Sequence, residues 1–182
     1  MRKTNNCDIT VIDNFLDPDD FIKVKEIFTS TTIPWYRTDG ISDHNATGSI
    51  KNPLDNYYFT HLLYNVNHIT SDHFNTLLEI FEPKIRKSMG LSFRTFIRIK
   101  ANCYMRTEEL QTHPWHCDAK DMADLYGGLF SLNTCDGYTG FIDGTNVESV
   151  ENRIVFFDSN DKHHSTSCTN AQNRLNINFN FV

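Results

Sequence analysis

The chain has 182 residues and a formal net charge of −6, with 39% hydrophobic and 13% aromatic residues. This length and composition predict a single folded domain with a substantial core. The acidic balance disfavours non-specific binding to nucleic acid, which depends on clustered Lys and Arg. The sequence has no apolar run of about eighteen residues and no secretory leader, which predicts no membrane span. The five cysteines form no C-x-x-C pair, which is typical of reduced thiols in a cytoplasmic protein.

Two helices are predicted in the first half of the chain. After a short strand within residues 8–16, Asp17 suits an N-cap and Pro18 the first helical position, so we expect a helix from there to residues 29–32. Residues 33–67 lack periodicity and are expected to form a loop. A second helix is expected between residues 71 and 90, with Pro83 kinking or interrupting it.

The second half of the chain is predicted to consist of β-strands. The expected strands cover residues 94–104, 127–133, 138–142, 147–150, 153–158 and 174–181. Two helices followed by short strands predict an α+β, mainly β fold, in which the helices brace a sandwich or jelly roll.

The two longest predicted strands each carry one polar face. On the last strand this face holds Arg174, Asn176, Asn178 and Asn180, and on the first it holds Arg98, Lys100, Asn102 and Tyr104. Faces rich in Asn and Tyr suit a barrel interior that holds a polar ligand. A solvent-facing outer surface is the alternative, and the residues alone leave both open.

The segment His116-Cys117-Asp118 is the main candidate for chemistry. In an extended segment, residues two apart point to the same side, so His116 and Asp118 can converge on one ion. Two histidines and a carboxylate form the facial triad of non-haem Fe(II) oxygenases, and His163-His164 offers the second histidine.

Taken in order, several segments resemble the Fe(II)/2-oxoglutarate-dependent dioxygenases, and most of all their small prolyl-4-hydroxylase-like members. The segments that carry the resemblance are residues 98–104, 116–118, 152–158, 163–169 and 174–179. The resemblance implies a double-stranded β-helix (jelly roll, cupin-like) braced by two N-terminal helices. It implies one catalytic domain over residues 1–182, with 1–92 as helical and loop support and 93–182 as the jelly-roll core.

The resemblance also implies roles for individual residues. His116, Asp118 and His163 would bind Fe(II), and Arg174 would pair with the distal carboxylate of 2-oxoglutarate through its planar fork. The residues that would help to hold this cosubstrate are Tyr104, Ser131 and Asn176. Asn176 stands where family members often have Ser. Arg153 is the rival of Arg174 and is interpreted as structural.

His163 is preferred to His164 as the third ligand. In the family-like run a Thr follows the ligand by six places, and Thr169 does so relative to His163. On a strand, His163 also shares its face with the small residues Ser165 and Ser167, which leave room for a cosubstrate.

The activity that the resemblance implies is hydroxylation of a C–H bond, coupled to conversion of 2-oxoglutarate and O2 into succinate and CO2, with ascorbate as an aid. The first candidate substrate is a prolyl residue of a peptide or protein, followed by a free amino acid or other small metabolite, and then a nucleic-acid base. Trp35, Tyr36 and residues 120–126 are candidate substrate lids. The alternatives are a non-catalytic cupin-type metal-binding module and a zinc hydrolase, but the chain lacks the H-x-H set of the first and the H-E-x-x-H helix of the second.

Overall fold

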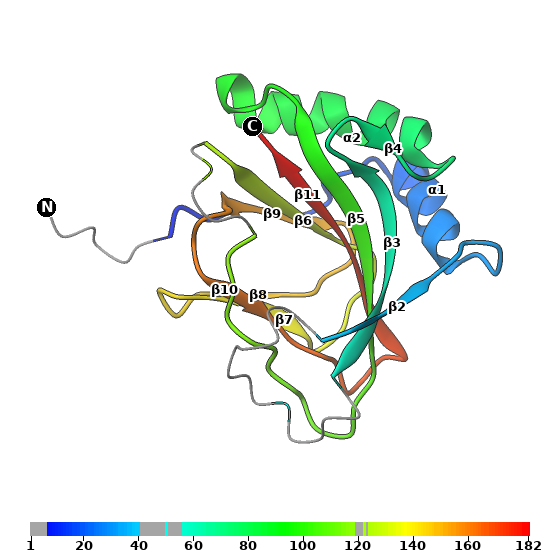
Figure 1. The fold of residues 1–182 in the computed structure, drawn as a ribbon, viewed down its shortest axis with the longest axis vertical. Helices are drawn as coiled ribbons and strands as arrows, with labels where there is room; N and C mark the ends of the chain where they lie inside the picture. The colour runs from blue at the N-terminus through cyan, green and yellow to red at the C-terminus, as the bar shows by residue number, and fades with distance from the viewer. Residues whose placement is uncertain (1–6, 41–49, 51–55, 119–121, 123) are drawn as a thin grey trace, which may run out of the picture.

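Two antiparallel β-sheets face each other, and two helices cover the outer side of the larger one (Figure 1). The structure is a computed structural model, and it describes residues 7–40, 50, 56–118, 122 and 124–182. In order across the large sheet, the strands are β1 (Thr10–Ile12), β9 (Arg153–Asp158), β6 (Tyr126–Ser131), β11 (Asn173–Phe181), β5 (Phe96–Met105), β3 (Tyr57–Asn65) and β2 (Tyr36–Asp39), with β4 (His68–Ile69) paired to β3. The small sheet has the order β10 (His163–Ser165), β7 (Tyr138–Phe141) and β8 (Asn146–Glu148). The predicted mainly β, α+β class is confirmed.

Both predicted helices are present. Helix α1 (Pro18–Thr29) begins with Pro at its first position, but the Asp17 carboxylate forms an ion pair with Lys84 (2.8 Å) instead of capping the helix. Helix α2 (Phe74–Met89) continues through Pro83, so the predicted interruption is wrong, and a 3₁₀ turn (Gly90–Ser92) follows it. None of the helices in the described part of the chain is long and apolar enough to cross a bilayer.

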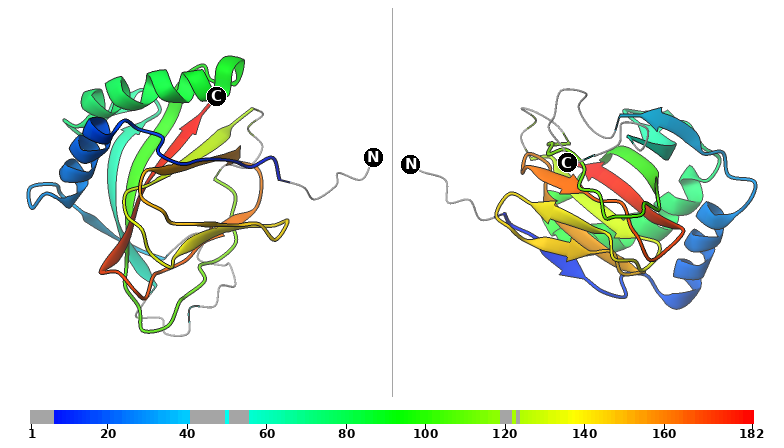
Figure 2. Two further views of the ribbon diagram at one scale, coloured as in Figure 1. Left: turned by 180° about the vertical axis from the view of Figure 1, so that it is seen from behind. Right: turned by 90° about the horizontal axis from the view of Figure 1, so that it is seen from below.

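The apolar faces of the strands pack under these helices. On β11, Leu175, Ile177, Phe179 and Phe181 are buried in the core that the helices complete. The ring of Phe81, from α2, lies 4.7 Å from that of Phe179. Figure 2 shows both helices on the same side of the large sheet, away from β7, β8 and β10. The strict alternation in the last strand therefore predicted its core face correctly.

Residues 33–67 are not only a loop. Strands β2 and β3 lie within them, and β3 pairs with β5 from Phe59 to Asn65. The first half of the chain therefore supplies strands of the large sheet as well as its helical support. The apolar alternation of strand β3 is interrupted because His61 occupies a core-facing position. Its Nδ1 donates to the Pro34 carbonyl and its Nε2 accepts from the Ser71 hydroxyl (both 2.8 Å). A histidine with both nitrogens satisfied can replace an apolar residue in a core face.

The polar faces of β11 and β5 look into the space between the sheets. The two strands are paired so that Arg174 lies opposite Tyr104, Asn176 opposite Asn102, Asn178 opposite Lys100 and Asn180 opposite Arg98. All four polar residues of β11 on this face are buried. The interior interpretation of this face is therefore confirmed, and the solvent-facing alternative is excluded.

All five cysteines are free thiols, as expected.

Candidate metal centre

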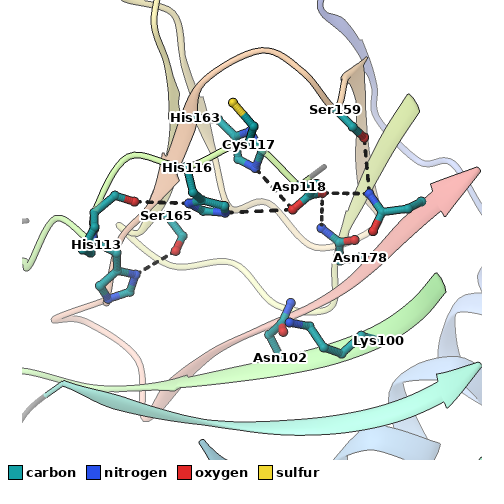
Figure 3. A network of polar contacts seen from close by, with 12 residues as sticks. Lys100, Asn102, His113, His116, Cys117, Asp118, Ser159, His163, Ser165 and Asn178 are labelled. Atoms are coloured by element: carbon teal, nitrogen blue, oxygen red, sulfur yellow. Dashed lines mark hydrogen bonds and ion pairs between the residues drawn. The ribbon is translucent and has the colours of Figure 1, made fainter. Parts of the chain in front are cut away.

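Three side chains from distant parts of the sequence meet between the two sheets. His116 lies in the segment between β5 and β6, and its backbone exchanges two hydrogen bonds of 2.9 Å with that of His163 at the start of β10. The Nε2 atoms of His116 and His163 lie 4.0 and 3.8 Å from Oδ1 of Asp118. All three donor atoms are within 4.8 Å of one another, a separation that one ion can bridge (Figure 3).

The orientation of both imidazoles follows from their backbone partners. Nδ1 of His116 lies 3.2 Å from the Pro114 carbonyl, and Nδ1 of His163 lies 2.9 Å from the Asp161 carbonyl. A carbonyl oxygen only accepts hydrogen bonds, so each Nδ1 carries a hydrogen and each Nε2 is the ring nitrogen that faces Asp118. Burial also lowers the pKa of His116, and His163 beside it lowers that pKa further. This favours the neutral form of His116, the form that binds metals.

Asp118 is held in its charged form by residues of the large sheet. Its Oδ2 accepts hydrogen bonds from the amides of Asn180 (2.8 Å) and Asn178 (3.2 Å), and Arg98 lies 3.6 Å from its Oδ1. Burial alone would raise the pKa of this carboxyl, but His163, Arg98 and the bond from Asn180 together lower it to about 2. Oδ1 is thus left to face the histidines as an anionic donor.

His164 faces away from this site. Its ring packs edge-on against that of Trp115, with the two ring centroids 4.4 Å apart. On the other side it lies close to Gly140, where an added Cβ atom would be 2.2 Å from Nε2 of His164. Adjacent residues of a strand point to opposite sides, so β10 brings only one of the two histidines to Asp118. That histidine is His163.

Arg174 is a buried cation without an acidic partner among the described residues. Its side chain is 1% exposed. Nη1 donates to the carbonyls of Tyr138 (2.9 Å) and Thr166 (3.2 Å), and Nη2 donates to Oγ1 of Thr139 (2.9 Å). Nε has no partner, and burial lowers the pKa of the guanidinium. Two of its five N–H donors thus remain for a ligand, and an anion would offset the cost of burying the charge.

A small cavity joins the two histidines to the surroundings of Arg174. Its lining includes His116 and His163, and also Thr139, which accepts the hydrogen bond from Nη2 of Arg174, and Ser165. The remaining lining residues are Asn102, Tyr104, Leu129, Phe157, Asn176 and Asn178.

The predicted cosubstrate residues differ in their positions. Tyr104 is stacked on Tyr58 (5.3 Å between ring centres) and borders the cavity. Asn176 also borders it, and its Oδ1 accepts from Asn102 (2.9 Å). Ser131 is buried beside Asn176 in the sheet but does not line the cavity.

Several functional positions were missed in the sequence. Arg98, Lys100, Asn178 and Thr139 had no predicted role, although the first three belonged to the polar faces that alternation had identified. Lys100 lies on the inner side of β5, near the triad in Figure 3, and burial and then Arg98 lower its pKa to about 8 while Asp118 opposes them. The lid candidate Trp35 instead packs on Phe28 in the helix-covered core, and residues 119–121 and 123 lie outside the described part of the chain.

No family model matches the sequence, and no curated protein matches it. Solved structures match over nearly the whole chain. An oxidoreductase of the 2OG-Fe(II) oxygenase family from Burkholderia pseudomallei is 8% identical, with a TM-score of 0.70 over 95% of this chain and 84% of that one. A prolyl-4-hydroxylase from Pseudomonas putida is 14% identical, with a TM-score of 0.62 over 97% and 93% of the two chains. The non-haem α-ketoglutarate-dependent epimerase SnoN of nogalamycin biosynthesis is 12% identical, with a TM-score of 0.65 over 96% and 78%.

These matches define the class of fold. The chain has the fold of the Fe(II)/2-oxoglutarate-dependent oxygenases, including prolyl hydroxylases, as the sequence resemblance predicted. At these identities the matches establish the fold alone, and a shared fold does not define a shared chemistry.

Proposed function

We propose that this protein is an Fe(II)- and 2-oxoglutarate-dependent dioxygenase that hydroxylates a C–H bond of its substrate. The observation that carries the proposal is the pairing of two features at one cavity. The two imidazoles of the triad line this cavity, and so does Thr139, which accepts a hydrogen bond from a buried Arg174 that has no acidic partner among the described residues. A site that only bound a metal would not need the second feature.

The two sheets would correspond to the two faces of a double-stranded β-helix. In that interpretation β7, β8 and β10 form the minor sheet, and the major sheet contains β9, β6, β11 and β5. Helices α1 and α2 brace the major sheet from outside (Figure 1). We treat residues 1–182 as one catalytic domain, because strands from both halves of the chain share the large sheet.

The donor set fits Fe(II). His116, Asp118 and His163 would occupy one face of the ion and leave the other face for cosubstrate and O2. Bound iron and 2-oxoglutarate would supply the oxidation, with release of succinate and CO2. The carbonyls of Pro114 and Asp161 fix the two imidazoles, and Asn178 and Asn180 fix the carboxylate. Such partners orient metal ligands and raise their affinity.

Arg174 would bind the distal carboxylate of 2-oxoglutarate. Nε and one hydrogen of Nη2 remain for it, since the other donors are used by Tyr138, Thr166 and Thr139. Two parallel N–H groups match the two oxygens of a carboxylate. Tyr104 and Asn176 would line the path between this carboxylate and the metal, and Ser131 would support Asn176 from the neighbouring strand.

The first candidate substrate is a prolyl residue of a peptide or protein, because the sequence resembles prolyl-4-hydroxylases most and one of them matches the fold. A free amino acid is the second candidate, and the charge distribution beside the metal favours it. A zinc hydrolase would use the same triad, but it gives no reason for a buried Arg174.

The test is a succinate assay together with a metal titration. Purified protein with Fe(II), ascorbate and O2 should convert 2-oxoglutarate to succinate slowly, and faster when a substrate is present. The Zn(II)-loaded protein should form no succinate, because Zn(II) has no redox chemistry. A protein that binds Fe(II) no better than background and forms no succinate with any pool of peptides or amino acids is not an oxygenase. Metal binding without succinate would favour the cupin-type module.

A further inference from the structure

A second, partly buried cation lies beside the proposed metal centre. Lys100 is on the inner side of β5, opposite Asn178, the residue whose amide holds Asp118. Its ammonium donates a long hydrogen bond to the Tyr58 hydroxyl (3.4 Å) and lies 5.5 Å from the centre of that ring. No carboxylate of the described residues forms an ion pair with it, because Asp118 is turned toward Arg98 and the histidines. An ammonium is costly to bury without an anion.

Two unsatisfied acceptors flank this cation on the same face. Oδ1 of Asn178 and Oδ1 of Asn102 are both buried and have no hydrogen-bond partner. The Asn178 amide cannot be turned over, since its Nδ2 is fixed by the bond to Asp118. Lone buried acceptors of this kind cost free energy, and they are found where a ligand supplies the missing donor.

The excess of positive charge on this face also favours an anionic ligand. Arg98, Lys100 and Arg174 bring positive charge to it, and among the described residues Asp118 is the carboxylate paired with Arg98 there. With Fe(II) and dianionic 2-oxoglutarate bound, positive charge would still exceed negative charge. Because Arg174 is assigned to 2-oxoglutarate, Lys100 remains for a different anion.

We propose that Lys100 binds a carboxylate of the substrate to be hydroxylated, and that Asn178 and Asn102 accept hydrogen bonds from an N–H group next to it. This inference rests on the proposed function and gives its substrate class. A carboxylate beside an N–H donor is the head group of a free α-amino or imino acid, and also of the C-terminal residue of a peptide. Asn178 contacts both this position and Asp118, so the bound molecule would lie directly beside the metal.

The experiment measures binding to the protein loaded with Fe(II) and 2-oxoglutarate, without O2, by calorimetry. The probes are the twenty common L-amino acids, then the carboxamide and the N-acetyl form of each binder, and tripeptides that end in it. In the wild-type protein the acid should bind at least tenfold more tightly than its amide. This preference should disappear in Lys100→Met and Lys100→Gln, and Lys25→Met should keep it, because Lys25 pairs with Glu151 (2.8 Å) on the surface.

Each outcome has one meaning. An acid-over-amide preference that is lost in both Lys100 variants supports the proposal, and retention of binding by the N-acetyl forms and tripeptides assigns the carboxylate to a peptide terminus. Equal binding of acid and amide, a preference that survives in the Lys100 variants, or no binding of any probe overturns it. The amide titration also shows that each variant is folded. If 2-oxoglutarate itself fails to bind, the proposed function fails as well, and this separates the two failures.

Discussion

Replacing Arg174 by Met is the sharpest test of the cosubstrate site. Met keeps much of the side-chain volume but removes the charge and all five donors. A hydrogen bond to a charged group contributes about 1.5–3 kcal/mol, so 2-oxoglutarate should bind roughly 10- to 150-fold more weakly, or weaker still if both N–H groups are used. Affinity for the metal alone should change little, since none of the hydrogen bonds of Arg174 goes to His116, Asp118 or His163.

The assay is thermal unfolding of the metal-loaded protein with and without 2-oxoglutarate. At a ligand concentration of about 100 times the Kd, binding stabilises the wild-type protein by about 2.7 kcal/mol. A Kd weakened about 100-fold reduces this stabilisation to roughly 0.4 kcal/mol at the same concentration. For a domain of this size the shift in Tm would fall from roughly 5–10 °C to about 1–2 °C.

Arg153→Met is the matched control. Arg153 binds Asp13 through two hydrogen bonds (2.6 and 3.0 Å) at the outer strands of the sheet, and its removal should leave the ligand-induced shift unchanged. An Arg174→Met protein with a wild-type shift would refute the assignment. So would an equal loss of the shift in both variants.

Three further predictions concern the surroundings of the metal. His163→Ala should abolish Fe(II) binding in a calorimetric titration, whereas His164→Ala should keep most of it; the reverse pattern would make His164 the ligand. Gly140→Ala should lower the free energy of unfolding in urea by about 1–3 kcal/mol, because its Cβ would lie 2.2 Å from Nε2 of His164; wild-type stability would contradict this packing. Burial, and then nearby positive charge, lower the pKa of His113 to about 3, so its contribution to stability is lost as pH falls below about 6.5. At pH 5 the loss is about 2 kcal/mol, and His113→Gln should remove most of that difference between pH 7 and pH 5; an unchanged difference would assign the acid sensitivity to other groups.

The polar ladder between β5 and β11 connects the two parts of the proposed site. One end of it holds Asp118 through Asn178 and Asn180, and the other end carries Arg174. Strands β11 and β5 share the longest paired register of the large sheet, so the carboxylate proposed to bind the metal and the guanidinium proposed to bind 2-oxoglutarate are both held by one pair of strands. Sites built on strands are positioned more accurately than sites built on loops.

The sequence by itself determined the class of the fold, the two helices and the facing of the last strand. These are local properties, because hydrophobic period and N-terminal helix signals act within a few residues. The strict alternation around Ile177 and Phe179 separated a core face from a polar face, and the structure has the same division. The spacing of His116 and Asp118 likewise indicated two donors on one side of a segment.

Only the tertiary structure decided the rest. Strand β3 was not predicted, because a histidine interrupts its apolar face. His61 can be buried there only because Pro34 and Ser71 satisfy both of its ring nitrogens, and the hydrophobic period of the sequence does not reveal these partners. The orientation of the His163 imidazole depends on the carbonyl of Asp161. Among the described residues, neither Arg174 nor Lys100 has a carboxylate as an ion-pair partner, and the sequence does not show this. Long-range strand pairing decides which side chains come together. The sequence could therefore identify the donor residues of the site, but not the partners that orient them or the hydrogen-bonding atoms that remain unused.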